Sequence, residues 1–424
     1  MNRGLATVAA LLLAAAPAAA QRDKKEECTV CGHDPEVMAA GGVVNHGPFM
    51  FFRSDSEEVE KHLGASSLLW IETAHFRIGS DLEKWKIPVR DKKAYLAELE
   101  LFAEAFPSVD PKKTKTLDPW LRLHLMAWRM ENLYAHTLEL WGWAEDDFLK
   151  LPDEQTFLAA KDGEWVEDLI EVHNASPARS EGFPVWIGLG RYLGMPMKLE
   201  ALILRYEQDM GTVKRDYIGH NNTHPQRWHI TWRIDGSDPV SRTMWFGFST
   251  EAESMKHDQH VHNALLHNVG INLLDGYMLY LVEAPVWLRA GWGHYLTQRN
   301  SIDYNFYDLD EGSTEQNRDE KNWMPAVREL VSKDEAPSFV ELGRLRSFGD
   351  LTLEAHLVSW SKLCWLMERD RAAFTKWLLY LKTVPNHSNN LDVQRDALRE
   401  AYDLGFPQAE EAWKQWVLDT YPVK

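Results

Sequence analysis

The chain has 424 residues, and its 46 lysine and arginine residues against 64 aspartate and glutamate residues give a formal net charge of −18. So acidic a protein is a poor partner for nucleic acid, because the phosphate backbone attracts a basic surface. The length allows a large buried core, in one elaborate domain or two.

Residues 1–21 are typical of a secretory signal peptide. Arg3 supplies the positive start, residues 6–16 are an apolar run, and the small residues 17–20 form a cleavage site before Gln21. The run is short for a bilayer span, and no later segment reaches about eighteen uncharged apolar residues. We therefore expect an exported protein, periplasmic or extracellular, without a transmembrane segment.

Residues 22–66 are predicted to be a weakly ordered lead-in that contains two of the three cysteines. Cys28 and Cys31 form a C-x-x-C pair, which in an oxidising compartment can close as a disulfide or stay redox-active. With His33, and with His46 as a further donor, the same pair can form a small zinc site. A c-type haem is disfavoured, because the residue after the second cysteine is not histidine. The other three interpretations stay open.

The first elements predicted beyond the lead-in are a strand at 68–78 and an amphipathic helix at 92–105. A long helix is predicted at 119–143, because Asp118 is a capping residue and Pro119 suits the first helical position. This helix carries two histidines, which we interpret as packing or capping residues rather than ligands: His124 and His136.

The second half alternates strands and helices before it becomes wholly helical. A strand at 199–204, a helix to about 217 and strands at 228–234 and 243–248 precede a long central helix at 251–281. The remaining predicted helices are 324–331, 353–382, 393–402 and 407–421. This order predicts an α+β fold.

The central helix and the segment after it carry a recognisable motif frame. The helix contains N-A-L-L-H at 263–267, and a P-x-W-L-x-x-G-x-x-x-Y segment at 285–295 follows it. This frame resembles the gluzincin zinc metallopeptidases, whose two helices carry H-E-x-x-H and W-L-x-E-G. The resemblance implies a gluzincin-like α+β domain at 67–300, with a small mixed sheet around the motif-bearing helix. A mostly helical C-terminal region at 301–424 would follow.

The residues that perform zinc chemistry in that family are replaced in this chain. The motif H-E-x-x-H works because positions i and i+4 share one helix face, so two imidazoles bind one zinc while the glutamate activates water. The corresponding positions hold Asn263, a poor zinc ligand, and Ala264, which accepts no proton; Ala290 replaces the third ligand. His267 remains, and His294 lies one turn after Ala290. A metal site would therefore depend on His267, His294 and Asn263. We expect no bound cofactor, and zinc is the one alternative that stays open.

The resemblance and its departures predict a non-catalytic, pseudoenzyme-like protein that binds a peptide or an envelope polymer in the former substrate cleft, or has a structural role. The residues expected to line that cleft are His260, Asn263, His267, Trp287 and His294. Two alternatives stay open: an atypical metal-dependent hydrolase using His267 and His294, and a carbohydrate-binding protein with exposed Trp228 and Trp232. A further interpretation makes Asn263, His267 and His294 a buried polar network.

Overall fold

The computed structural model shows a mixed α+β fold. It describes residues 27–51, 54–63, 68–144, 171–174, 183–184, 198–218, 226–233, 239–277, 284–307, 321, 323–383 and 391–423. The predicted signal peptide lies outside these residues. Among the helices described, none is long and apolar enough to cross a membrane.

The principal sheet has eight strands among the described residues, in the order β1-β4-β5-β10-β12-β11-β8-β9. Their bounds, in that order, are Val43–Asn45, Leu69–Thr73, Phe76–Ser80, Leu199–Leu204, Pro239–Ser249, Gln226–Arg233, Glu171–Asn174 and Phe183–Pro184. Strand β10 pairs in parallel with β5 and β12, and the other pairs are antiparallel. Every residue of β10 is buried, which agrees with the nearly continuous apolar run of a central parallel strand. Two short ribbons pair β2 (Met50–Phe51) with β3 (Ser54–Asp55) and β6 (Trp85–Lys86) with β7 (Thr116–Leu117).

The single strand predicted at 68–78 is wrong, because this segment makes the hairpin β4–β5. The turn lies at residues 74–75, and the Thr73 hydroxyl bonds the backbone N–H and C=O of Phe76 across it, at 3.3 and 3.5 Å. No Gly, Pro, Asn or Asp marks the turn. The hydroxyl of a strand residue supplies the turn's hydrogen bonds instead.

The two helices predicted before residue 145 are confirmed. Helix α3 spans Lys92–Ala105 and α4 spans Pro119–Trp141. The Asp118 carboxylate caps α4 by accepting from the Leu121 N–H at 3.0 Å, and Gly142 ends the helix with φ of 65°. The smaller helices of this half are α1 (Pro35–Ala40), α2 (Ser56–Leu63) and α6 (Glu207–Val213), the last continued by a π-helical turn at Lys214–Ile218.

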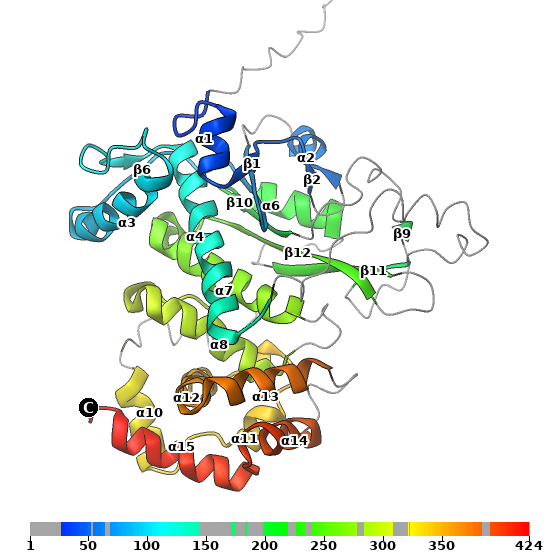
Figure 1. The fold of residues 1–424 in the computed structure, drawn as a ribbon, viewed down its shortest axis with the longest axis vertical. Helices are drawn as coiled ribbons and strands as arrows, with labels where there is room; N and C mark the ends of the chain where they lie inside the picture. Colours follow the sequence, from blue (N-terminus) through cyan, green and yellow to red (C-terminus); the bar gives the residue numbers. More distant parts are fainter. Residues whose placement is uncertain are drawn as a thin grey trace, which may run out of the picture.

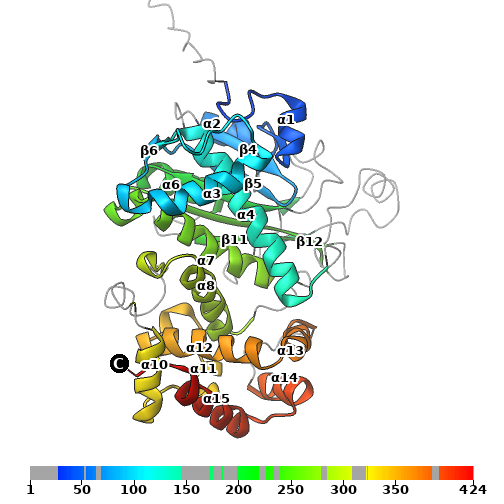
Figure 2. The same cartoon turned by 60° about the vertical axis from the view of Figure 1, so that its left-hand side comes forward.

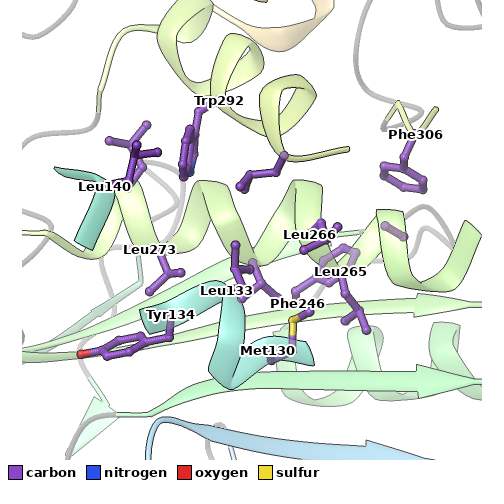
Figure 3. Close-up of a cluster of buried hydrophobic side chains, with 14 of the residues drawn as sticks. Met130, Leu133, Tyr134, Leu140, Phe246, Leu265, Leu266, Leu273, Trp292 and Phe306 are labelled. Carbon is purple, nitrogen blue, oxygen red and sulfur yellow. The ribbon is translucent and has the colours of Figure 1, made fainter. Parts of the chain in front are cut away.

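The central helix α7 (Asp258–Gly276) lies between the sheet and helix α8 (Val286–Asn300) (Figure 1). Nearly every α7 residue is buried, because α4, the sheet and α8 cover it on different sides. Side chains of α4, α7 and β12 meet in one apolar core, among them Met130, Leu265 and Phe246 (Figure 3). The helix begins later than the sequence predicts, because Glu253–Lys256 forms a 3-10 turn and His257 is an extended N-cap residue.

The C-terminal helices pack on the side of α8 away from the sheet (Figures 1 and 2). They are α10 (Trp323–Ser332), α11 (Phe339–Gly343), α12 (Leu353–Arg369), α13 (Arg371–Thr383), α14 (Leu391–Tyr402) and α15 (Phe406–Thr420). The single helix predicted at 353–382 is wrong, because Asp370 adopts an extended backbone with φ of −162° and ψ of 110°. Its carboxylate then accepts from the Ala373 N–H at 3.0 Å, so it caps α13.

The expectation of a weakly ordered lead-in is wrong for residues 27–51. Strand β1 joins the edge of the principal sheet by pairing with β4, and Cys28, Val30 and Cys31 are buried in the common core. The lead-in therefore belongs to the same folded body as the sheet.

Candidate metal centre

Four ligand-bearing side chains converge where the lead-in contacts the start of α4. Cys28 and Cys31 lie in the turn before α1, His46 directly follows β1, and His124 lies in the second turn of α4. Their ligand atoms all lie within 4.8 Å of one another. In the ranges that the structure describes, this is the one group of three or more His, Cys, Asp or Glu side chains with such convergence.

The separations between these atoms suit a tetrahedral metal. The His124 Nε2 atom lies 3.2 Å from both Cys28 Sγ and His46 Nε2, and Cys31 Sγ lies 4.0 Å from each imidazole Nε2. Zinc bonds of about 2.3 Å to sulfur and about 2.1 Å to nitrogen, at tetrahedral angles, separate neighbouring ligand atoms by roughly 3.3 to 3.8 Å. Small movements of the side chains would bring all four atoms to zinc-binding distance.

A tight turn holds the two cysteines together. The Gly32 N–H donates to the Cys28 carbonyl at 2.8 Å, and the Cys31 N–H points at Cys28 Sγ at 3.4 Å. Gly32 and His33 both have left-handed backbone angles, with φ of 59° and 56°. Glycine adopts that conformation without strain, which allows the chain to reverse directly after the second cysteine.

Burial shifts the pKa values of His46, His124 and Cys31. It lowers the pKa of His46 to about 4, reinforced by the nearby His33, and lowers the pKa of His124 to about 3, reinforced by His46 and His33. Burial and a hydrogen bond to Cys28 raise the pKa of the Cys31 thiol to about 12. Both imidazoles are thus neutral near pH 7 with a lone pair available, whereas the Cys31 thiol needs a bound cation to ionise.

Three of the four residues of this cluster are buried, and His46 is partly buried. Cys28 and Cys31 are 2% and 4% exposed, and His124 is 1% exposed. The Trp120 ring stands edge-on to His46 at 5.0 Å between centroids, and the Phe106 ring stands edge-on to His124 at 5.1 Å. A closed four-ligand arrangement is typical of a structural zinc site, in contrast to a catalytic site with an open position.

The sequence-based zinc interpretation named part of this cluster. Cys28 and Cys31 are free thiols that face the cluster, and His46 is the third member. His33 lies outside the converging group, with its Nδ1 atom 3.1 Å from the outer nitrogen of His46. The sequence predicts His124 as a packing residue and does not place it beside the thiols, yet its Nε2 atom lies 3.2 Å from Cys28 Sγ and 4.0 Å from Cys31 Sγ. The available signal was one imidazole within the apolar run L-R-L-H-L-M, and that signal is weak.

The residues of the N-A-L-L-H motif have different neighbours. Asn263 is fully buried, and its amide nitrogen donates to the Tyr304 and Ser301 carbonyls at 2.5 and 3.3 Å. Its amide oxygen accepts from Asn300 Nδ2 at 2.6 Å. The Asn263 side chain therefore binds the last residue of α8 and the segment after it rather than a shared centre with His267.

His267 and His294 are also fully buried, with ring centroids 5.0 Å apart. His294 Nε2 lies 2.9 Å from Nδ1 of His356 on α12. Gly293 makes the α7–α8 contact close, because a Cβ atom there would lie 2.5 Å from His267 Nδ1. The three imidazoles thus form a row between α7, α8 and α12, and they do not form one converging ligand group.

The other residues named from the sequence are placed as follows. Trp287 is 2% exposed and donates to Gln394 Oε1 at 3.1 Å, while His260 is half-buried against the Tyr304 ring. Ala264 and Ala290 are fully buried. Of the five residues predicted to line a cleft, His260 alone has appreciable exposure. Trp228 and Trp232 lie on β11, and their side chains fall outside the described part of the structure.

No protein-family model, curated protein or solved structure matches this chain. The candidate metal centre and the gluzincin resemblance therefore depend on the chain's own residues.

Proposed function

We propose that this chain is an exported zinc-binding protein with a structural zinc at Cys28, Cys31, His46 and His124. The observation that carries the proposal is the convergence of the ligand atoms of two thiols and two neutral imidazoles within 4.8 Å of one another, in a largely buried part of the fold. Two soft thiolates with two imidazoles are a preferred zinc donor set.

The zinc would fasten the lead-in to the body of the protein. The four ligands come from three separate segments, and Cys28 and His124 are 96 residues apart. The direct polar contacts that also join the lead-in to this region include Thr29 to the Asp118 carboxylate at 3.0 Å and Ser108 to the Val30 carbonyl at 2.5 Å. These neutral or exposed contacts are each worth about 1 kcal/mol, whereas a structural zinc contributes about 10–16 kcal/mol.

We further propose that α7 and α8 form a gluzincin-like frame without peptidase chemistry. The substitutions at Asn263, Ala264 and Ala290 remove a ligand, the base and another ligand, and Asn263 is committed to backbone carbonyls. A protein of this kind acts by binding a peptide or envelope polymer, or as a structural partner. The alternative, a hydrolase that uses His267 and His294, depends on the proximity of these two rings, whose centroids lie 5.0 Å apart.

Metal content of purified protein separates these proposals. We expect about one zinc per wild-type chain, retained in His267→Ala/His294→Ala and lost in Cys28→Ser/Cys31→Ser. Peptide and ester hydrolysis should be absent from all three. A wild-type chain that takes up no zinc, even when reduced and incubated with zinc, contradicts the metal centre. Zinc that disappears with the helix histidines but survives the cysteine substitutions supports the hydrolase instead.

A further inference from the structure

His33 occupies a particular place beside the metal centre. It directly follows the C-x-x-C-G turn, and its Nδ1 atom lies 3.1 Å from His46 Nδ1. On the other side of its ring, Nε2 accepts from the Cys28 N–H at 3.3 Å. The ring stands nearly perpendicular to that of His46, at 84°, and the Trp120 ring contacts both edge-on, with centroids 5.5 Å from His33 and 5.0 Å from His46. His33 is thus held against the outer nitrogen of a predicted ligand.

The orientation of His46 determines which of its nitrogens can bind metal. Its Nε2 atom faces Cys31 Sγ and His124 Nε2, so a metal in the cluster would use Nε2. A neutral imidazole that binds through Nε2 carries its proton on Nδ1, and this N–H needs an acceptor. The group placed to accept it is His33 Nδ1.

We propose that His33 is a positioning residue that fixes the tautomer and ring orientation of His46 for zinc binding; this rests on the proposed Cys28–Cys31–His46–His124 centre. Outer hydrogen-bond partners of this kind raise the basicity of a ligating imidazole and lower its rotational freedom. His33 therefore contributes to zinc affinity without touching the metal. The sequence suggested His33 as a zinc ligand, whereas here His33 hydrogen-bonds to a ligand, His46.

The proton inventory of the two rings gives the proposal a further consequence. A neutral imidazole has one N–H and one acceptor nitrogen, so His33 cannot accept from both the Cys28 amide and His46 at once. Without metal, the Cys28 amide donates to His33 Nε2, His33 Nδ1–H donates to His46, and the His46 proton is on Nε2. With metal, the His46 proton is on Nδ1 and the His33 proton is on Nε2. Each ring stays neutral, and the Cys28 amide loses His33 Nε2 as its acceptor when the metal binds.

Three substitutions of His33 distinguish the roles of its two ring nitrogens. His33→Asn keeps an acceptor at the position of Nδ1, His33→Gln moves the acceptor to the position of Nε2, and His33→Ala removes both. Asparagine also tolerates the left-handed backbone angle of residue 33. His62→Gln is the matched control, because His62 bonds to Asp216 on a remote surface.

The measurement is zinc affinity by competition with a chromogenic chelator, together with the visible absorption of the cobalt-substituted full chain. We expect His33→Asn and the control to bind zinc within a few-fold of wild type, and His33→Gln and His33→Ala to bind about 10- to 100-fold more weakly. All variants should keep the spectrum of a four-coordinate cobalt with two sulfur ligands.

Two results would overturn the proposal while leaving the metal centre intact. Equal affinity of all three variants and wild type means that His46 needs no outer partner. An asparagine variant as weak as alanine, with the cobalt spectrum changed, means that His33 is itself a ligand. A wild-type chain that binds neither metal contradicts the proposed function itself, and so the two failures are distinguishable.

Discussion

Two regions of this molecule bring histidines together, and they do so in different ways. At the start of α4, two imidazoles and two thiols direct their ligand atoms to one point. Between α7, α8 and α12, three buried imidazoles lie in a row, and Asn263 bonds to the backbone of the next segment. Most side chains of both regions are buried, so burial alone does not distinguish them.

The comparison shows that the direction of the ligand atoms separates a metal site from a packed polar core. Lone pairs that converge repel each other until a cation or proton lies between them, whereas two neighbouring imidazoles can share one hydrogen bond, as His294 Nε2 and His356 Nδ1 do at 2.9 Å. The second region contains the gluzincin-like motif. At its first ligand position, however, Asn263 donates to backbone carbonyls instead of facing a metal. The first region has no contiguous motif beyond C-x-x-C, yet its geometry suits zinc.

The largest expected effect tests the converging group. His124→Ala should weaken zinc binding by more than about 100-fold, because four ligands share roughly 10–16 kcal/mol. His136→Ala removes a histidine from the same helix and should leave zinc affinity unchanged. Chelator competition measures both. Similar zinc affinity in the two variants would place the metal elsewhere.

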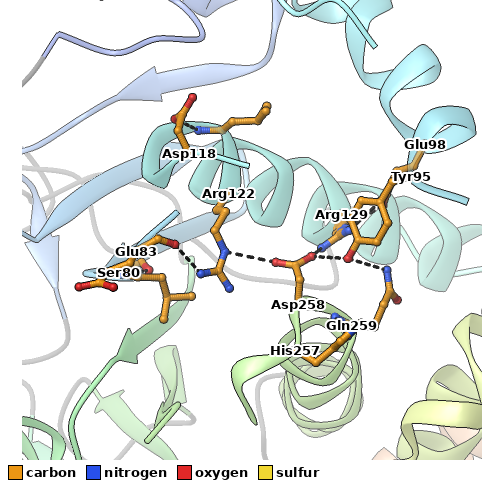
Figure 4. Close-up of polar contacts among 12 residues, drawn as sticks. Ser80, Glu83, Tyr95, Glu98, Asp118, Arg122, Arg129, His257, Asp258 and Gln259 are labelled. Atoms are coloured by element: carbon orange, nitrogen blue, oxygen red, sulfur yellow. Dashed lines mark hydrogen bonds and ion pairs between the residues drawn. The ribbon is translucent and has the colours of Figure 1, made fainter. Parts of the chain in front are cut away.

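The second prediction tests whether α4 couples the two regions. Asp258, at the start of α7, is fully buried and bonds Arg129 Nη1 on α4 at 2.9 Å and the Tyr95 hydroxyl at 2.8 Å, with Arg122 Nε at 3.4 Å (Figure 4). Asp258→Asn should lower the free energy of unfolding by about 3–5 kcal/mol, because two buried guanidinium groups lose their shared counter-charge. Denaturant titration measures the loss. Zinc affinity should stay within a few-fold of wild type, and a large drop would show that α4 transmits strain between the regions.

The Asp258 carboxylate should also make the free energy of unfolding depend on pH in the acid range. Burial by itself would raise the pKa of Asp258, but Arg129 and Arg122 hold it well below the usual range. Its stabilising contribution is therefore complete above the unfolded pKa of about 3.9 and is lost as pH falls toward the lower folded pKa. Denaturant titrations with a chelator present, from about pH 4 downward, should show a shallower loss of stability in Asp258→Asn than in wild type. Equal slopes would assign the acid sensitivity to other groups.

The third prediction concerns the row of imidazoles. His267→Ala should lower the free energy of unfolding by about 2–4 kcal/mol, because it leaves a cavity against Gly293. Zinc content should not change. Gly293→Ala alone should cost about 1–3 kcal/mol by overpacking against His267, and the double variant should cost less than the sum. Strict additivity in thermal or denaturant unfolding would mean that the two residues do not meet in solution.

The smallest effect is expected at the edge of this region. Asn300→Ala removes the exposed donor to Asn263 Oδ1, and water can replace it in part. The cost should be about 1 kcal/mol in a denaturant titration. Asn300→Ser, which keeps a donor, should recover part of that loss. An Asn300→Ala variant as damaging as His267→Ala would make the Asn263 contacts the main support of the helix pair.

The sequence by itself determined elements whose boundaries are set by neighbouring residues. Helix α4 begins at Pro119 because Asp118 caps it, and β10 at 199–204 is recognisable from its apolar run. The break at Asp370 and the turn after Thr73 escaped prediction, because aspartate and threonine are compatible with a helix and a strand until their side chains bond the backbone. Local hydrogen bonds of polar side chains compete with regular structure, and the winner depends on the surrounding packing.

The tertiary structure alone decided which residues form the candidate metal centre. The C-x-x-C pair could be predicted from the sequence as two metal ligands. His124 lies 96 residues from Cys28 along the chain, and His46 reaches the cluster because β1 pairs with β4. The tertiary structure also places His33 outside the four converging residues, against the outer nitrogen of His46. Spacing along the chain fixes contacts only within a turn or a helix face, since that geometry is local. The position of α4 beside the lead-in depends on burying one shared apolar core, which is a property of the whole chain.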